Sequence, residues 1–192
     1  MISLKYNSDY RYEDVMVGNK LREVAVYVGP LFYVKGINKK EGKKPIWTVV
    51  YVVLLWLFFF VGLISKSNLS HFVVSILSYA LAAIGIYKLT IFSYAAMTAS
   101  KEEKFTRKLK DTLENDSKTG AALVLAFSSL ALVASVVYSV VGQVIFLFGD
   151  YLFLLALLFM VIISLCCFIR TRKITAEEVV SEEPENNNDI TQ

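Results

Sequence analysis

Lys88 is the residue of this chain whose type and position point most directly to chemistry, because it lies inside an apolar run from residue 71 to residue 98. A charge deep in a membrane costs at least about 2.5–3.5 kcal/mol, so it needs a partner, water or a route to the interface. The apolar runs of the chain offer no carboxylate except Asp150, at a predicted turn. Lys88 is therefore either a functional contact or a residue close to the membrane surface.

In the functional interpretation, Lys88 contacts an anion or a substrate with support from Tyr79, Tyr87 or Gln143. In the structural interpretation, its ammonium reaches the headgroups while its methylene stem stays in lipid. The second is easiest if the helix ends near residue 89 and residues 90–99 follow the surface, whereas a long, tilted helix would hold Lys88 inside it. The sequence leaves both interpretations open.

Few other side chains are reactive. His71 is the only histidine, and at the start of an apolar run we expect it to be an interfacial residue rather than a proton relay or a metal ligand. Cys166 and Cys167 are adjacent and offer neither a disulfide framework nor zinc-ligand spacing. They are either palmitoylation sites or small apolar fillers. We expect no metal and no cofactor.

Catalytic and phosphate-binding motifs are missing from the sequence. Gly36, Gly42 and Lys43 come near to a P-loop, but the glycines are one residue too far apart and Lys44 replaces the Ser or Thr. The apolar runs hold no pair of titratable groups that could divide acid and base roles. A net charge of +3 without a large basic surface argues against nucleic acid. We therefore expect neither an enzyme nor a nucleic-acid-binding protein.

The elements that must position these residues are four apolar runs. The chain is 56% hydrophobic, against about 45–50% apolar for a soluble protein. The first run has nineteen residues and no charge, which as a helix is about 28 Å long and matches the hydrocarbon thickness. Because 45 mostly polar residues come first, we expect this run to stay as an anchor rather than to be cleaved. The sequence predicts an all-α membrane protein with transmembrane helices over residues 46–64, 71–98, 121–148 and 150–169.

The distribution of Lys and Arg predicts the topology. Residues 1–45 hold nine, residues 100–120 hold six and residues 170–192 hold three of the twenty. Cytoplasmic loops carry an excess of these residues, and four crossings place all three segments on one side. We therefore predict a plasma-membrane protein with both termini in the cytoplasm. Asn68 starts a glycosylation motif on the outer side, but the loop is too short to favour its use.

Three polar segments complete the predicted organisation. Residues 1–45 form a cytoplasmic N-terminal region that ends in a basic linker, which attracts anionic lipid. Within it, the alternation of residues 21–37 around Gly29-Pro30 predicts a short β-hairpin. Residues 100–119 predict a cytoplasmic amphipathic helix, from a capping box at Ser100. The acidic segment 170–192 has no apolar period and predicts a disordered tail.

Small residues predict how the helices meet. In a bilayer, helix contacts depend on small side chains that allow close approach. The second and third runs each carry such residues at three- or four-residue steps, and we expect the two faces to pack together. The predicted faces are Ser75, Ser78, Ala82 and Gly85 in one run, and Ser128, Ala131, Ser135, Ser139 and Gly142 in the other.

The tyrosine-rich N-terminus, the stretch VAVYVGPLFYVKGI at residues 24–37, the basic linker and the four runs together form a recognisable layout. It resembles that of uncharacterised small four-helix membrane proteins of Gram-positive bacteria. The resemblance implies a bacterial cell membrane and imports no activity and no functional residue.

We expect a non-catalytic accessory, regulatory or scaffolding subunit that works with the lipid bilayer and with another membrane or cytoplasmic protein, or as a homo-oligomer. A large part of the chain lies in polar segments outside the predicted spans, and the spans themselves offer no polar pathway. Both features favour this function. The alternative is a small transporter or permease-like subunit, with Lys88, Tyr87 and Gln143 lining a site between the second and third helices.

Overall fold

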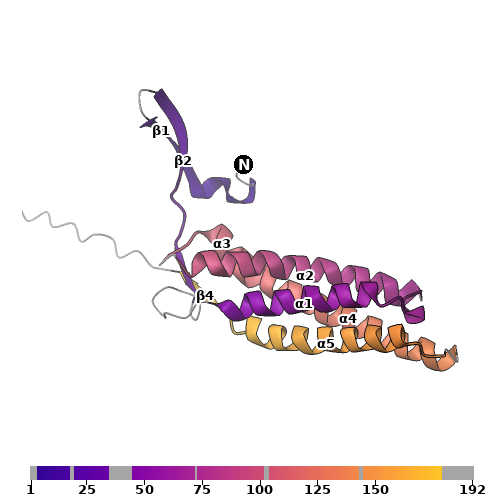
Figure 1. Cartoon of the computed structure of the whole chain (residues 1–192). Coiled ribbons are helices and arrows are strands. Elements are labelled where there is room, and N and C mark those ends of the chain that lie inside the picture. Colours follow the sequence, from indigo (N-terminus) through magenta and orange to yellow (C-terminus); the bar gives the residue numbers. More distant parts are fainter. Residues whose placement is uncertain are drawn as a thin grey trace, which may run out of the picture.

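Four long helices form the body of the molecule in the computed structural model, which describes residues 4–17, 20–34, 45–71, 73–101, 104–142 and 145–178. They pack as a bundle (Figure 1), in which α2 contacts α4, α4 contacts α5, and α1 contacts both α5 and α2. All four are long and apolar enough to cross a membrane. The helices are α1 (Ile46–Ile64), α2 (Val73–Ala99), α4 (Ser117–Val141) and α5 (Phe148–Thr171).

The first helix has the bounds predicted for the first span, residues 46–64. The second, Val73–Ala99, is one unbroken helix, so residues 90–99 continue its axis and do not turn onto the surface. The fourth begins two residues before the predicted span and ends two residues after it. α1 and α2 follow the apolar runs closely because a polar or charged segment interrupts each run at both ends, and α5 ends at such a segment.

The middle of the chain differs from the sequence prediction. We expected a separate amphipathic helix over residues 100–119 and a span over 121–148. Instead α3 (Arg107–Asp111), the π-helical segment η4 (Thr112–Asp116) and α4 follow one another as a single helix, residues 107–141. The helix starts at Arg107 and not at Ser100, and it ends at Val141 and not at residue 148.

The π-helical segment has a physical reason. Leu109, Leu113 and Ser117 are spaced four residues apart, more than the 3.6 residues of an α-helical turn. An α-helix would rotate such a stripe progressively away from its neighbour, whereas a wider π turn keeps the residues in line. Leu113 and Ser117 are fully buried, and η4 packs on α2.

A β-hairpin forms at the N-terminus, but not where the alternation of residues 21–37 predicted it. β1 (Tyr10–Val17) and β2 (Lys20–Tyr27) pair antiparallel, with Tyr10 opposite Tyr27 and Val17 opposite Lys20. Gly29-Pro30 does not turn the chain between two paired strands but ends the second strand. The N–H groups of Val28 and Gly29 instead donate to the carbonyl oxygen of Asp9, at 2.9 and 3.2 Å.

Three segments far apart in the sequence meet at one end of the bundle. β3 (Phe32–Val34) pairs antiparallel with β4 (Ala176–Glu178), and Phe32 and Phe105 exchange two backbone hydrogen bonds of 2.9 and 3.0 Å. We call β3, β4 and Phe105 the junction, and the end of the bundle that carries it the junction end. The prediction of a disordered tail over residues 170–192 is therefore wrong for residues 170–171, which end α5, and for residues 176–178. Residues 179–192 lie outside the described part of the chain.

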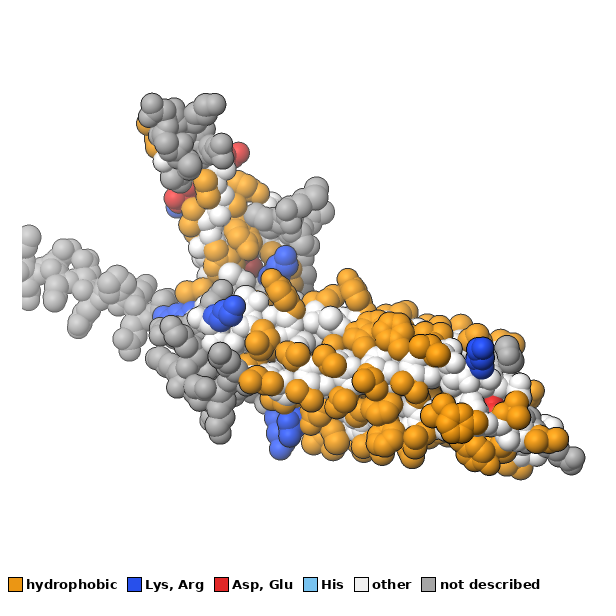
Figure 2. All heavy atoms as spheres, in the orientation of Figure 1, with side chains coloured by type: hydrophobic (Ala, Val, Ile, Leu, Met, Phe, Trp, Pro, Cys, Tyr) orange, Lys and Arg blue, Asp and Glu red, His pale blue; other side chains and the backbone are white. Residues whose placement is uncertain are grey.

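Apolar side chains fill the inside of the bundle and also cover its outside. Leu55, Ile86, Val124 and Leu157 are fully buried between the helices. Figure 2 shows hydrophobic side chains along the length of the bundle, with Lys and Arg gathered mainly at the junction end. A soluble monomer rarely exposes a continuous apolar patch of more than a few hundred Å². The outer surface is therefore of the kind that suits contact with lipid. Its exposed residues include Val53, Leu57, Phe60, Val133, Val137, Ile162 and Leu165.

Candidate functional site

Lys88 lies on the flank of the bundle with a carboxylate beside it. Its Nζ is 3.2 Å from Oδ1 of Asp116, and the two side chains are 35% and 30% exposed. We expected no carboxylate partner other than Asp150, and that expectation is wrong. The continuous helix 107–141 runs antiparallel to α2 and brings Asp116 alongside Lys88, which a separate surface helix would not do. The pair removes a net charge from this flank.

The residues that we grouped with Lys88 do not gather around it in the described part of the chain. The side chain of Tyr87 is 61% exposed. Tyr79 is buried and turned toward α1, where its ring stacks on Phe59 at 4.6 Å and its hydroxyl donates to the Phe59 carbonyl oxygen. Gln143 lies outside the described residues.

The two faces of small residues lie against each other, and α2 and α4 form the most extensive helix contact of the bundle. The Oγ atoms of Ser75 and Ser135 are 2.9 Å apart. Because the Ser135 hydroxyl donates to the Ala131 carbonyl oxygen, Ser75 is the donor in this pair. Gly85 meets Gly120 and Val124 on the facing helix. The predicted residues Ser78, Ala82, Ser128 and Ser139 are buried as well, whereas Gly142 is exposed at the end of α4.

Asp150 is a buried carboxylate at the end of the bundle opposite the junction. It sits in the first turn of α5 and is fully buried. Its Oδ1 accepts from the Ser67 hydroxyl at 2.6 Å and from the Asn68 N–H at 2.7 Å. Its Oδ2 accepts from the Leu147 N–H at 2.8 Å. The carboxylate thus caps the start of α5 and fixes the turn between α1 and α2.

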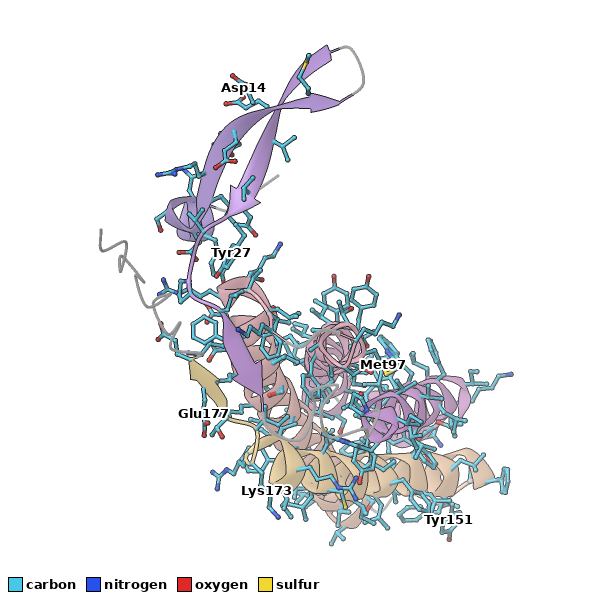
Figure 3. All side chains as sticks on the ribbon, turned by 90° about the vertical axis from the view of Figure 1, so that its left-hand side faces the viewer. Asp14, Tyr27, Met97, Tyr151, Lys173 and Glu177 are labelled. Carbon is cyan, nitrogen blue, oxygen red and sulfur yellow. The ribbon has the colours of Figure 1, made fainter. Side chains whose placement is uncertain are left out.

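The β-hairpin projects away from the bundle. Figure 3 shows Asp14 far along it and Tyr27 at its base, near α3. The hairpin is a two-stranded sheet, and apolar side chains are exposed on both of its faces. By the strand register, Tyr12 and Met16 share one face and Val24 and Val26 share the other.

The base of the hairpin is fixed to the start of helix 107–141. The Tyr27 hydroxyl donates to the Pro30 carbonyl oxygen at 2.8 Å and accepts from the Arg107 N–H at 3.0 Å. The Tyr6 hydroxyl donates to Oδ2 of Asp111 at 2.8 Å. Burial raises the pKa of Tyr27 above its ordinary value, which extends to higher pH the range in which the hydroxyl can donate. These contacts hold the hairpin in place while its faces stay open.

The two cysteines and the histidine lie at opposite ends of the bundle. Cys167 is buried and Cys166 is exposed, both near the junction end of α5. His71 ends the short 3-10 helix η3 (Asn68–His71). Within the described residues, no three His, Cys, Asp or Glu side chains come together as metal ligands.

Comparisons with known proteins found no similar protein. No family model, no curated protein and no solved structure matches the chain significantly. The class that the fold defines is a four-helix bundle whose helices are long and apolar enough to cross a membrane, with a projecting β-hairpin.

Proposed function

We propose that the chain is a multi-pass protein of a bacterial cell membrane that serves as a non-catalytic accessory, regulatory or scaffolding subunit. The hairpin of residues 10–27 is its contact with a protein partner. The observation that carries the proposal is the pair of open apolar faces on this hairpin, with Met16 at 68% and Tyr12 at 52% exposure. An isolated two-stranded hairpin is marginal in water, so a partner that covers these faces would stabilise it.

We further propose that both termini are cytoplasmic. The even number of long apolar helices and the meeting of β3, β4 and Phe105 at one end support a common side for the polar segments. The excess of Lys and Arg in these segments favours the cytoplasm. At the same end, the guanidinium of Arg170 lies 5.6 Å from the ring of Trp47, and both residue types are usual at a membrane interface.

Crosslinking in intact cells tests the partner. A photoreactive residue replaces Met16 on the hairpin or, as the control, Val137, which is exposed on the outer face of α4. We expect a discrete protein adduct at residue 16 and none at residue 137. The same adduct is expected in a Lys88→Leu background, because the hairpin does not contact Lys88.

Two results would argue against the proposal. If residue 16 gives no adduct while the chain is inserted, the hairpin is not a contact surface. If Lys88→Leu abolishes the biological activity but leaves insertion and the adduct intact, the transporter alternative gains support. For the topology, protease should cut the hairpin in inside-out vesicles and spare it in right-side-out vesicles; the reverse pattern would contradict cytoplasmic termini.

A further inference from the structure

A groove lies between the last turns of α2 and the start of helix 107–141. Its volume is about 330 Å³, at the small end of the range of about 300–1,000 Å³ for ligand sites. Ile91 and Leu109 give it an apolar part. Thr98, Thr106 and Lys108 give it a polar part. A site of this size holds a segment of a larger molecule rather than a whole lipid or a large cofactor.

The groove lies at the level of the membrane interface, if the chain is inserted as proposed. The Oγ atoms of Thr48 and Ser93 are 3.2 Å apart, which places this part of α2 beside the first turn of α1. Trp47, in the same turn, lies 6.3 Å from the ring of Phe92. Tryptophan prefers the headgroup region. The groove residues on α2, from Ile91 to Thr98, all lie within two turns of Phe92 and Ser93, so they span the boundary between hydrocarbon and headgroups.

Polarity changes along the groove in the direction that an amphiphile requires. From Ile91 to Thr98 the helix rises by about 10 Å. Ile91 lies toward the middle of the bundle, whereas Thr98, Thr106 and Lys108 lie toward the junction end. Thr112 lies further along helix 107–141, but its hydroxyl already donates to the Lys108 carbonyl oxygen at 3.2 Å. A bound lipid would place its acyl chain and its headgroup in this order.

Charge favours an anionic headgroup. None of the residues that line the groove is acidic, and the one charged side chain among them is Lys108, which is exposed. The surrounding segment, residues 100–112, holds five basic and three acidic residues. Anionic lipids are attracted to such segments at the cytoplasmic surface by about 1 kcal/mol per basic residue.

We propose that this groove binds one anionic phospholipid of the cytoplasmic leaflet. Its phosphate contacts Lys108, and part of one acyl chain lies against Ile91 and Leu109. The proposal rests on the proposed insertion of the chain in a membrane. It assigns to the start of helix 107–141, which also holds the base of the hairpin through Arg107, the role of a lipid contact.

Native mass spectrometry of the full chain tests the proposal. The chain is released from nanodiscs that contain phosphatidylcholine and phosphatidylglycerol, and the retained lipids are counted. We expect one phosphatidylglycerol per chain to be retained in preference to phosphatidylcholine. Lys108→Gln should lower its retention about fivefold, the equivalent of one surface charge. Ile91→Trp, which fills the apolar part of the groove from an exposed position, should lower it as well.

Lys104→Gln is the matched control, because Lys104 is exposed in the same segment but does not line the groove. It removes the same charge from the segment but no contact with a lipid bound in the groove, so it should lower retention clearly less than Lys108→Gln does. Equal retention of the two lipids, or equal losses in Lys108→Gln and Lys104→Gln, would overturn the groove proposal while membrane insertion stands. Recovery of the chain in water without detergent or lipid would instead overturn the proposed function, and this inference with it.

Discussion

Gly85 is the position where one added methyl group should disturb the bundle most clearly. A Cβ at this position would lie 2.7 Å from Cγ2 of Val124, 2.8 Å from its backbone nitrogen and 2.9 Å from the carbonyl oxygen of Gly120. Two of these three atoms belong to the backbone, so a change of side-chain rotamer cannot relieve the contact. Gly85→Ala therefore requires α2 and α4 to move apart.

The magnitude follows from two opposing terms. Overpacking of a close contact costs about 1–3 kcal/mol. Replacing glycine by alanine inside a helix gains about 1 kcal/mol in helix propensity. The side chain of Val124 could yield, but its backbone nitrogen and the carbonyl oxygen of Gly120 could not. We expect a net loss of about 1 kcal/mol in the free energy of unfolding, and more for Gly85→Leu.

Reversible unfolding by SDS in mixed lipid–detergent micelles, followed by circular dichroism, measures this loss. Ala80→Val is the control, because Ala80 is exposed on the same helix. Gly120→Ala should cost less than Gly85→Ala, since the nearest atoms to its added Cβ lie at 3.1 Å. A Gly85→Ala protein as stable as the original, or more stable, would show that the close approach of α2 and α4 does not hold the bundle.

Two further predictions concern buried polar groups. Asp150→Asn should lower the free energy of unfolding by about 1–3 kcal/mol, because an amide cannot accept from every donor that the carboxylate accepts from, including the Leu147 N–H. The same change at the exposed Asp14 should have little effect, and equal effects would contradict the capping role. In mild detergent, a maleimide should label Cys166 and spare the buried Cys167, with both labelled after unfolding. Equal labelling of the folded chain would refute the position of α5.

The presence of four long helices, and the approximate bounds of α1, α2 and α5, could be predicted because the signal for them is local. A run of apolar residues that is long enough to cross a bilayer is visible without knowledge of any neighbour. The small-residue faces of α2 and α4 could also be found, because their three- and four-residue spacing already defines a stripe on one helix. The structure brings these faces together, as in the contact of Ser75 with Ser135.

The hairpin was misplaced because strand pairing is not local. The alternation of Val24, Val26 and Val28 drew attention to the second strand and to the residues after it. The first strand, YRYEDVMV, is mostly polar and has no clear period. A signal was nevertheless present: Gly18-Asn19 separates two eight-residue strands, and such a dipeptide is frequent between paired strands.

The ion pair of Lys88 with Asp116 shows a second limit of sequence reasoning. Asp116 lies in a charged segment, and charge suggested that this segment leaves the bundle. The segment stays in the bundle because one of its faces is apolar: Leu109 is half-buried and Leu113 is fully buried. The charged residues occupy the other faces of the same helix, so the helix can pack on α2 and still carry a carboxylate to Lys88.

The same helix connects the features that we propose to be functional. At its start, Arg107 holds the base of the hairpin through Tyr27, and Lys108 lines the groove. Further along, Asp116 pairs with Lys88, and Gly120 meets Gly85 in the close contact of α2 and α4. All of these contacts belong to residues 107–120 of one helix, so a displacement of this helix at the α2–α4 interface would also displace the residue that holds the hairpin. If this is correct, Gly85→Ala should alter crosslinking at Met16 even though the two residues are not in contact.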